Sequence, residues 1–144
     1  MSKTKRIILT AIFLIIFKST AFAGDMIDMG KIIAIESSGN PGAYNAKSKA
    51  RGLCQVTEIC LKEWNNYHPK EKYLAGDLFR SETNLRIAGW YLETRIPQML
   101  RHYEIAVTVE NVLIAYNAGI SYLVKGLTLP KETAGYIRKY NEGR

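Results

Sequence analysis

Residues 81–99 read SETNLRIAGWYLETRIPQM and contain the longest helical pattern of the chain. Apolar side chains recur there at steps of three or four, which places them on one helical face: Leu85, Ala88, Leu92, Ile96 and Met99. Pro97 lies inside the pattern, and we expect it to kink or break the helix because proline lacks the backbone N–H of the helical ladder. The stretch predicts a long amphipathic helix beginning near Ser81.

Outward from this segment, capping and stop signals divide the chain into shorter helices. These are expected at about residues 25–37, 57–65, 109–117, 122–125 and 130–140. Asp25, Thr57 and Thr108 are the expected N-caps, and Pro130 opens the last helix. No stretch alternates convincingly like a β-strand. The expected class is therefore all-α, with at most a tiny hairpin near residues 50–56.

The first 23 residues have the pattern of a signal peptide. A basic start precedes an apolar run at residues 7–17, and Ala21-Phe22-Ala23 matches an A-x-A cleavage site. The run has about half the roughly 20 residues of a membrane-spanning helix, and a lysine follows it directly, which argues against an uncleaved anchor. We expect a cleaved signal peptide at 1–23, a single domain at 24–144 without a membrane span, and export to the periplasm or the medium.

Charge and composition exclude several functions. The chain carries 20 Lys+Arg and 13 Asp+Glu, and removing the four cations of residues 1–23 leaves 16 against 13, a net charge of +3. This balance does not suggest a nucleic-acid partner, although it suits an anionic matrix such as a cell wall. His68 and His102 are isolated and lie in no metal-ligand spacing. With no phosphate-binding loop and no serine nucleophile motif, we expect no metal and no cofactor.

Glu36 is the first candidate for chemistry. A lone glutamate near a helix end is usually a solvated charge, but Glu36 follows the apolar run Ile32-Ile33-Ala34-Ile35. A carboxyl in such surroundings is partly desolvated, and desolvation raises its pKa. A glycosidase acid requires that shift in order to hold its proton near neutral pH.

A series of short motifs follows Glu36 along the chain. They are Glu36-Ser37, Gly52-Leu53-Cys54-Gln55, Asp77-Leu78-Phe79, Glu82-Thr83-Asn84-Leu85-Arg86, Tyr91-Leu92, Ala115-Tyr116-Asn117-Ala118-Gly119 and Pro130 with Glu132-Thr133 and Tyr136. In this order they resemble the soluble lytic transglycosylase family over about residues 27–140. The Ala-Tyr-Asn-Ala-Gly segment matches that family residue for residue, whereas Cys54 stands where the family usually has Met.

The resemblance implies a lysozyme-like helical fold, of the goose-type and SLT kind, with a sugar-binding cleft. It implies that Glu36 is the single catalytic acid/base and that the substrate is contacted by Ser37, Gln55, Tyr116, Asn117, Glu132 and Tyr136. Gln55 offers a donor and an acceptor for a sugar, and tyrosine faces can stack on pyranose rings. Simpler roles stay open: core packing for the tyrosines, a structural cap for Asn117 and a helix-dipole contact for Glu132.

The implied reaction cleaves peptidoglycan between MurNAc and GlcNAc and closes a 1,6-anhydroMurNAc ring. Intramolecular attack by the MurNAc C6 hydroxyl makes a second protein carboxylate unnecessary. Two alternatives stay open: a hydrolytic lysozyme of the goose type, and an exported wall-binding module without turnover. The chain also resembles specialised transglycosylases that serve secretion, conjugation or pilus machines, but no residue names such a partner.

The two cysteines of the chain, Cys54 and Cys60, are six residues apart. Export would place them in an oxidising compartment where a disulfide can form, if the loop curls back far enough. The alternative is a pair of small buried hydrophobic side chains, since Cys54 replaces an apolar Met.

Overall fold

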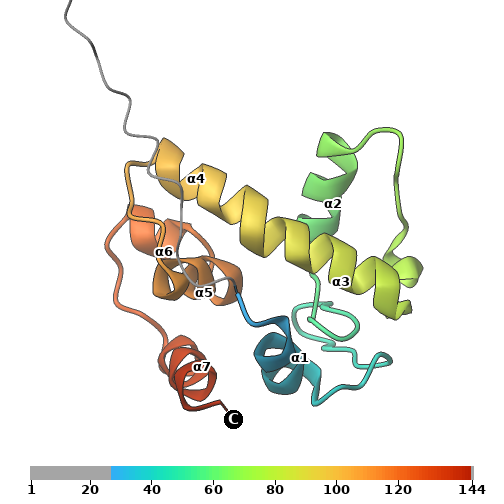
Figure 1. Cartoon of the computed structure of the whole chain (residues 1–144), viewed down its shortest axis with the longest axis horizontal. Helices are drawn as coiled ribbons and strands as arrows, with labels where there is room; N and C mark the ends of the chain where they lie inside the picture. The colour runs from blue at the N-terminus through green and yellow to red at the C-terminus, as the bar shows by residue number, and fades with distance from the viewer. Residues whose placement is uncertain (1–26, 144) are drawn as a thin grey trace, which may run out of the picture.

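The computed structural model describes residues 27–143, which form helices joined by short loops and contain no β-strand (Figure 1). This confirms the all-α prediction. The predicted signal peptide and the expected cap Asp25 lie outside the described residues. The α-helices are α1 Met29–Ser37, α2 Glu58–Tyr67, α3 Ser81–Trp90, α4 Ile96–His102, α5 Val109–Asn117, α6 Ser121–Val124 and α7 Lys131–Glu142. In the region where the sequence allowed a tiny hairpin there are two isolated bridges, Tyr44 with Arg51 and Arg51 with Val56.

Side-chain caps begin three of these helices. The Asp28 carboxylate accepts from the N–H groups of Gly30 at 2.9 Å and Lys31 at 3.2 Å, so Asp28 is the N-cap of α1, where the sequence predicted Asp25. The Asp28 N–H also donates to the Tyr140 hydroxyl at 2.8 Å, which ties this cap to α7. Thr57 and Thr108 cap α2 and α5 as the sequence predicted.

The long helix is not broken at Pro97. In Figure 1, α3 and α4 lie end to end as one rod, joined by a π-helical turn at Tyr91–Arg95, η2. The Ile96 N–H donates to the Tyr91 carbonyl five residues back. A proline ring normally clashes with the carbonyl four residues before it. The wider turn just before Pro97 relieves that clash, so the expected kink or break becomes a local change of helical repeat.

This rod carries the centre of the hydrophobic core. Ile87, Ala88, Leu92, Ile96 and Leu100 are fully buried on it, whereas Leu85 and Met99 of the expected face are only half-buried. The wider π turn lengthens the repeat and brings Leu100 to the core in place of Met99. The α3 part of the rod contacts α2, and the α4 part contacts α5. Away from the rod, α1 contacts α7. No helix within residues 27–143 has the length and apolarity that a bilayer crossing needs.

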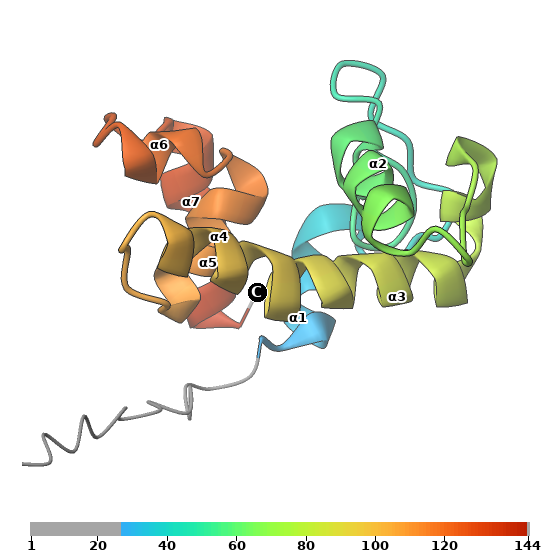
Figure 2. The same ribbon diagram turned by 90° about the horizontal axis from the view of Figure 1, so that it is seen from above.

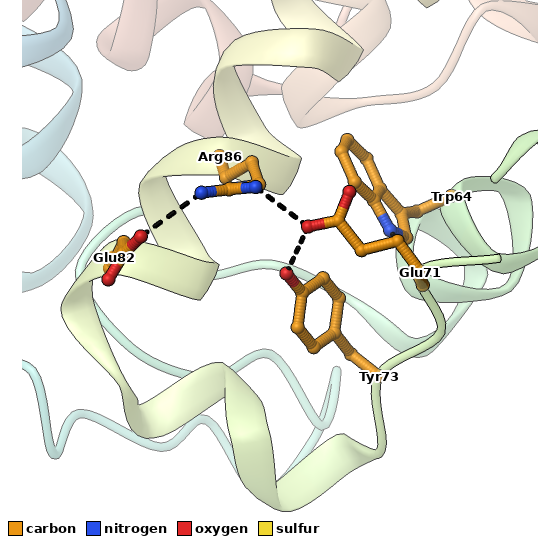
Figure 3. A network of polar contacts seen from close by, with 5 residues as sticks. All are labelled: Trp64, Glu71, Tyr73, Glu82 and Arg86. Atoms are coloured by element: carbon orange, nitrogen blue, oxygen red, sulfur yellow. Dashed lines mark hydrogen bonds and ion pairs between the residues drawn. The ribbon is translucent and has the colours of Figure 1, made fainter.

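A polar network fastens the connection after α2 to α3 (Figure 3). The Glu71 carboxylate accepts from Arg86 at 2.7 Å and from the Tyr73 hydroxyl at 2.6 Å, and Arg86 also pairs with Glu82 at 3.0 Å. The Trp64 indole N–H donates to the Glu71 carbonyl at 2.8 Å. The Tyr73 hydrogen bond and Arg86 lower the pKa of the Glu71 carboxyl. Exposed ion pairs of this kind add little to the free energy of unfolding. We therefore assign the network a positioning role: it fixes the segment after α2 relative to α3.

Candidate active site

A cleft of about 560 Å³ contains most of the predicted site residues. One wall comes from the loop of residues 45–50 and the start of α2, and the other from the end of α5, α6 and the start of α7. Figure 2 shows α2 and α6 projecting from the same side of the α3–α4 rod, well separated along it. The volume lies within the range of about 300–1,000 Å³ that is common for small-molecule sites.

Glu36 lies in the last turn of α1 and lines this cleft. Burial raises the pKa of its carboxyl from 4.5 to about 7; interaction with the Tyr136 hydroxyl lowers it, and the negative charge of Glu132 raises it. Desolvation is the largest of these effects. A carboxyl with this pKa holds its proton in much of the protein population near neutral pH and can act as an acid there.

Tyr136 of α7 is buried next to Glu36, with 5% of its surface exposed, and it does not line the cleft. Its hydroxyl acts on the Glu36 carboxyl, but the contact falls short of full hydrogen-bond geometry, so the hydroxyl has no formed partner among the described residues. Burial and then the charge of Glu36 raise the pKa of the phenol. Tyr136 is therefore a neutral donor held close to the carboxylate form of Glu36.

The turn that carries Gln55 is anchored by Asn84. The fully buried Asn84 amide accepts from the Cys54 N–H at 2.8 Å and donates to the carbonyls of Arg51 at 2.7 Å and Leu78 at 2.8 Å. Gly52 has a φ of +76°, and a Cβ there would overlap both the Asn84 side chain and the Leu78 carbonyl. Close approach of the turn to α3 thus requires glycine at this position.

Gln55 lines the cleft, but its amide hydrogens are already used. Its Nε2 donates to the carbonyls of Gly52 at 3.0 Å and Ala43 at 3.3 Å, and its φ is +51°. The donor role toward a sugar that the sequence suggested is therefore taken within the turn. The Oε1 atom is the part of Gln55 left to accept from a ligand.

Tyr116 and Asn117 line the cleft from the end of α5 and also brace its floor. The Tyr116 hydroxyl donates to the Cys54 carbonyl at 2.7 Å, and its ring centroid lies 6.2 Å from that of Tyr91. The buried Thr133 hydroxyl donates to Asn117 Oδ1 at 2.8 Å, joining α5 to α7. Both residues thus have structural contacts as well as a surface in the cleft.

The structure brings Glu36, Gln55, Tyr116, Asn117 and Glu132 together on one cleft surface. Ser37 does not line it, because the Ser37 hydroxyl turns back and donates to the Ile33 carbonyl at 3.3 Å.

Sequence reasoning missed four residues of this region: Asn84, Lys47, Tyr91 and Tyr122. Asn84 and Tyr91 stood in the quoted motifs without a site role being assigned to either, and Asn84 had a second signal. It stands four residues before the buried Ala88, hence on the buried helix face, where an amide must find partners. Within residues 27–143 no group of three His, Cys, Asp or Glu side chains could hold a metal ion.

Cys54 and Cys60 are free thiols in the structure, so the disulfide that the sequence allowed is not formed. Each side chain is buried in the hydrophobic core, as in the alternative interpretation. Burial raises the pKa of the Cys54 thiol to about 12 and raises that of the Cys60 thiol. Both are thus poorly reactive in the folded state.

We therefore expect two reactive thiols per chain when purified, unreduced protein is unfolded and treated with a thiol reagent. The same reagent is expected to react slowly with the folded protein because both thiols are buried. A count of zero in the unfolded protein would contradict this and restore the disulfide.

Comparison with known families supports one assignment. Residues 14–137 match the family described as the Transglycosylase SLT domain, which is well over half of the chain. No curated protein and no solved structure gives a significant match. Proteins with this domain are lytic transglycosylases that act on peptidoglycan. With a helical fold and a cleft that holds a glutamate of raised pKa, the chain belongs to the Transglycosylase SLT family.

Proposed function

We propose that this protein is a lytic transglycosylase that cleaves the β-1,4 bond between MurNAc and GlcNAc, with Glu36 as its catalytic acid and base. The observation that carries the proposal is the raised pKa of Glu36, about 7, in a cleft of about 560 Å³. A group that titrates near the working pH can both give and take a proton efficiently.

In the proposed reaction, protonated Glu36 gives its proton to the glycosidic oxygen, and the bond from that oxygen to MurNAc C1 breaks. The acetamido carbonyl of the substrate stabilises the positive charge at C1. The Glu36 carboxylate then takes the proton of the C6 hydroxyl while O6 attacks C1. Glu36 is protonated again at the end, and the product carries a 1,6-anhydroMurNAc terminus.

Glu132 is the observation that favours the rival reaction, hydrolysis. It lines the same cleft as Glu36 and acts on the pKa of Glu36 through its charge. A hydrolase needs a second carboxylate as base or nucleophile, at about 6.5–9.5 Å or about 5–5.5 Å from the acid respectively. Glu58 is less suited to that role, since it pairs with Arg51 at 3.3 Å and does not line the cleft.

We expect digestion of purified sacculi to release muropeptides ending in 1,6-anhydroMurNAc, without new reducing ends. Mass spectrometry distinguishes the two outcomes because the anhydro product is lighter than the hydrolysed one by one water. We expect Glu132→Gln to keep the anhydro product. Reducing-end products that disappear in Glu132→Gln would identify a lysozyme, and binding to sacculi without release would identify a wall-binding module.

We further propose that the protein is exported and opens the wall locally, for remodelling or for a secretion, conjugation or pilus machine. The signal-peptide pattern of residues 1–23 supports export. A deletion strain complemented with Glu36→Gln tests the role: assembly of the machine should fail as in the uncomplemented deletion. Normal assembly in the deletion strain would count against it.

A further inference from the structure

The charges that line the cleft are unevenly distributed. Glu36 and Glu132 lie on the α1 and α7 side, and Lys47 of the opposite loop is the one cation among the described lining residues. Lys47 forms no ion pair with a described residue. Arg51, at the end of the same loop, is engaged by Glu58 and lies over the Tyr44 ring at 5.3 Å. Lys47 is therefore the cation available to a ligand in the cleft.

The loop around Lys47 is held by its own hydrogen bonds. Asn45 Oδ1 accepts from the N–H groups of Lys47 at 3.0 Å and Ser48 at 3.2 Å. The Asn45 N–H donates to the Ala50 carbonyl at 3.0 Å, and the Ala50 N–H donates to the Ser48 hydroxyl at 3.3 Å. In Figure 2 this loop, teal in the colour scale, projects beyond α2 on the side away from the α3–α4 rod. The turn thus holds the Lys47 backbone at the cleft wall.

The charge of the ligand follows from the function proposed above, on which this step rests. The hydroxyl and acetamido groups of a peptidoglycan strand are uncharged. Its ionised groups hang from the lactyl ether of MurNAc: carboxylates of the stem peptide, or the lactyl carboxylate itself when the peptide is absent. Glu36 and Glu132 repel such a group when they are ionised, and Lys47 on the opposite wall attracts it.

We propose that Lys47 binds a carboxylate of the lactyl-linked substituent of MurNAc. The contact makes the cleft favour acidic glycan strands over neutral ones. It also directs the substituent toward the loop of residues 45–50 and away from Glu132, which sets the direction in which the strand lies in the cleft.

The test compares three probes: peptide-bearing glycan strands, strands stripped of peptide by an amidase, and neutral chitooligosaccharides. We expect Lys47→Gln to lower kcat/KM for at least one acidic strand by about 3–5-fold at low salt, the scale of one exposed ion pair. Lys47→Arg should keep the wild-type value. Added salt should reduce the difference, because it screens exposed charges. The matched control is Lys49→Gln, an exposed lysine of the same loop that does not line the cleft, and it should have no effect.

The acidic strand that responds identifies the source of the carboxylate. Chitooligosaccharide binding should be unchanged in Lys47→Gln. An equal loss on the neutral probe, an equal effect of Lys49→Gln, or no effect on either acidic strand would overturn the proposal. Failure of the proposed function is distinguishable from failure of the Lys47 proposal. If the wild type shows no turnover, or makes reducing ends, the proposed function fails. The affinity of the same variants for the acidic and neutral strands still tests Lys47.

Discussion

Replacing Glu36 by Gln is expected to lower the rate of muropeptide release by about 10²–10⁴-fold, the usual contribution of general acid–base catalysis. Glutamine keeps the size and polarity of the side chain but has no proton to transfer. The measurement is the initial rate of release from purified sacculi, followed by liquid chromatography. In the wild type, the rate should fall as the pH rises above about 7, because ionised Glu36 cannot act as the acid.

The same variant is expected to be more stable than the wild type at alkaline pH. Glu36 has a raised pKa in the folded state, about 7 against 4.5, so the folded protein binds this proton more tightly than the unfolded chain. The contribution of Glu36 to wild-type stability is then fully present below pH 4.5, falls as the pH rises, and is lost once the pH passes about 7. The pKa difference corresponds to about 3 kcal/mol of unfolding free energy.

Denaturant unfolding of both proteins at pH 5 and pH 8 measures this difference. The gap between Glu36→Gln and wild type should be small at pH 5 and should widen at pH 8. This readout also shows that the variant is folded, so loss of activity cannot come from unfolding. Activity near the wild-type level would show that the acid is another residue, and a gap independent of pH would contradict the raised pKa.

Replacing Asn84 by Ala is expected to lower the unfolding free energy by about 3–5 kcal/mol, because each buried polar group left without a partner costs about 1–3 kcal/mol. The change removes the partners of the Cys54 N–H and of the Arg51 and Leu78 carbonyls. In a domain of this size the melting temperature should fall by roughly 10–20 °C. Thermal unfolding measures the shift.

Activity of Asn84→Ala, measured well below its melting temperature, should also fall. The turn that Asn84 anchors carries Gln55, and the Cys54 carbonyl in that turn accepts from Tyr116 in the cleft floor. The matched control is Asn66→Ala, in an exposed position of α2, which should change neither stability nor activity. Equal melting temperatures for the two variants would show that Asn84 does not hold the turn.

Much of the helical framework could be predicted because helix signals are local. Thr57 and Thr108 cap their helices through N–H groups three residues ahead, at 3.3 Å and 3.1 Å. Gly119 and Gly126, glycines of the kind that end helices, adopt positive φ values just after α5 and α6. The π turn before Pro97 was missed, because a proline inside an apolar pattern is equally compatible with a kink, a break or a wider turn.

Site residues were predicted unevenly for a related reason. A motif names a residue but not the direction of its side chain. Ser37 turns back onto α1, and the donors of Gln55 are spent on the carbonyls of Ala43 and Gly52. Lys47 was not among the predicted site residues, since nothing in the sequence shows that its loop forms a cleft wall.

By itself the sequence determined the helical class, the order of the helices and the position of Glu36 at the end of an apolar helix, because these depend on residues within about one or two helical turns. Only the tertiary structure decided how acidic Glu36 is, since the extent of its burial depends on packing, and the hydroxyl and the charge that also act on its pKa belong to Tyr136 and Glu132, far along the chain. It also decided that Asn84 anchors a turn 30 to 33 residues away and that both cysteines are free. Such contacts form only when packing brings distant segments together and buried polar groups must find partners there.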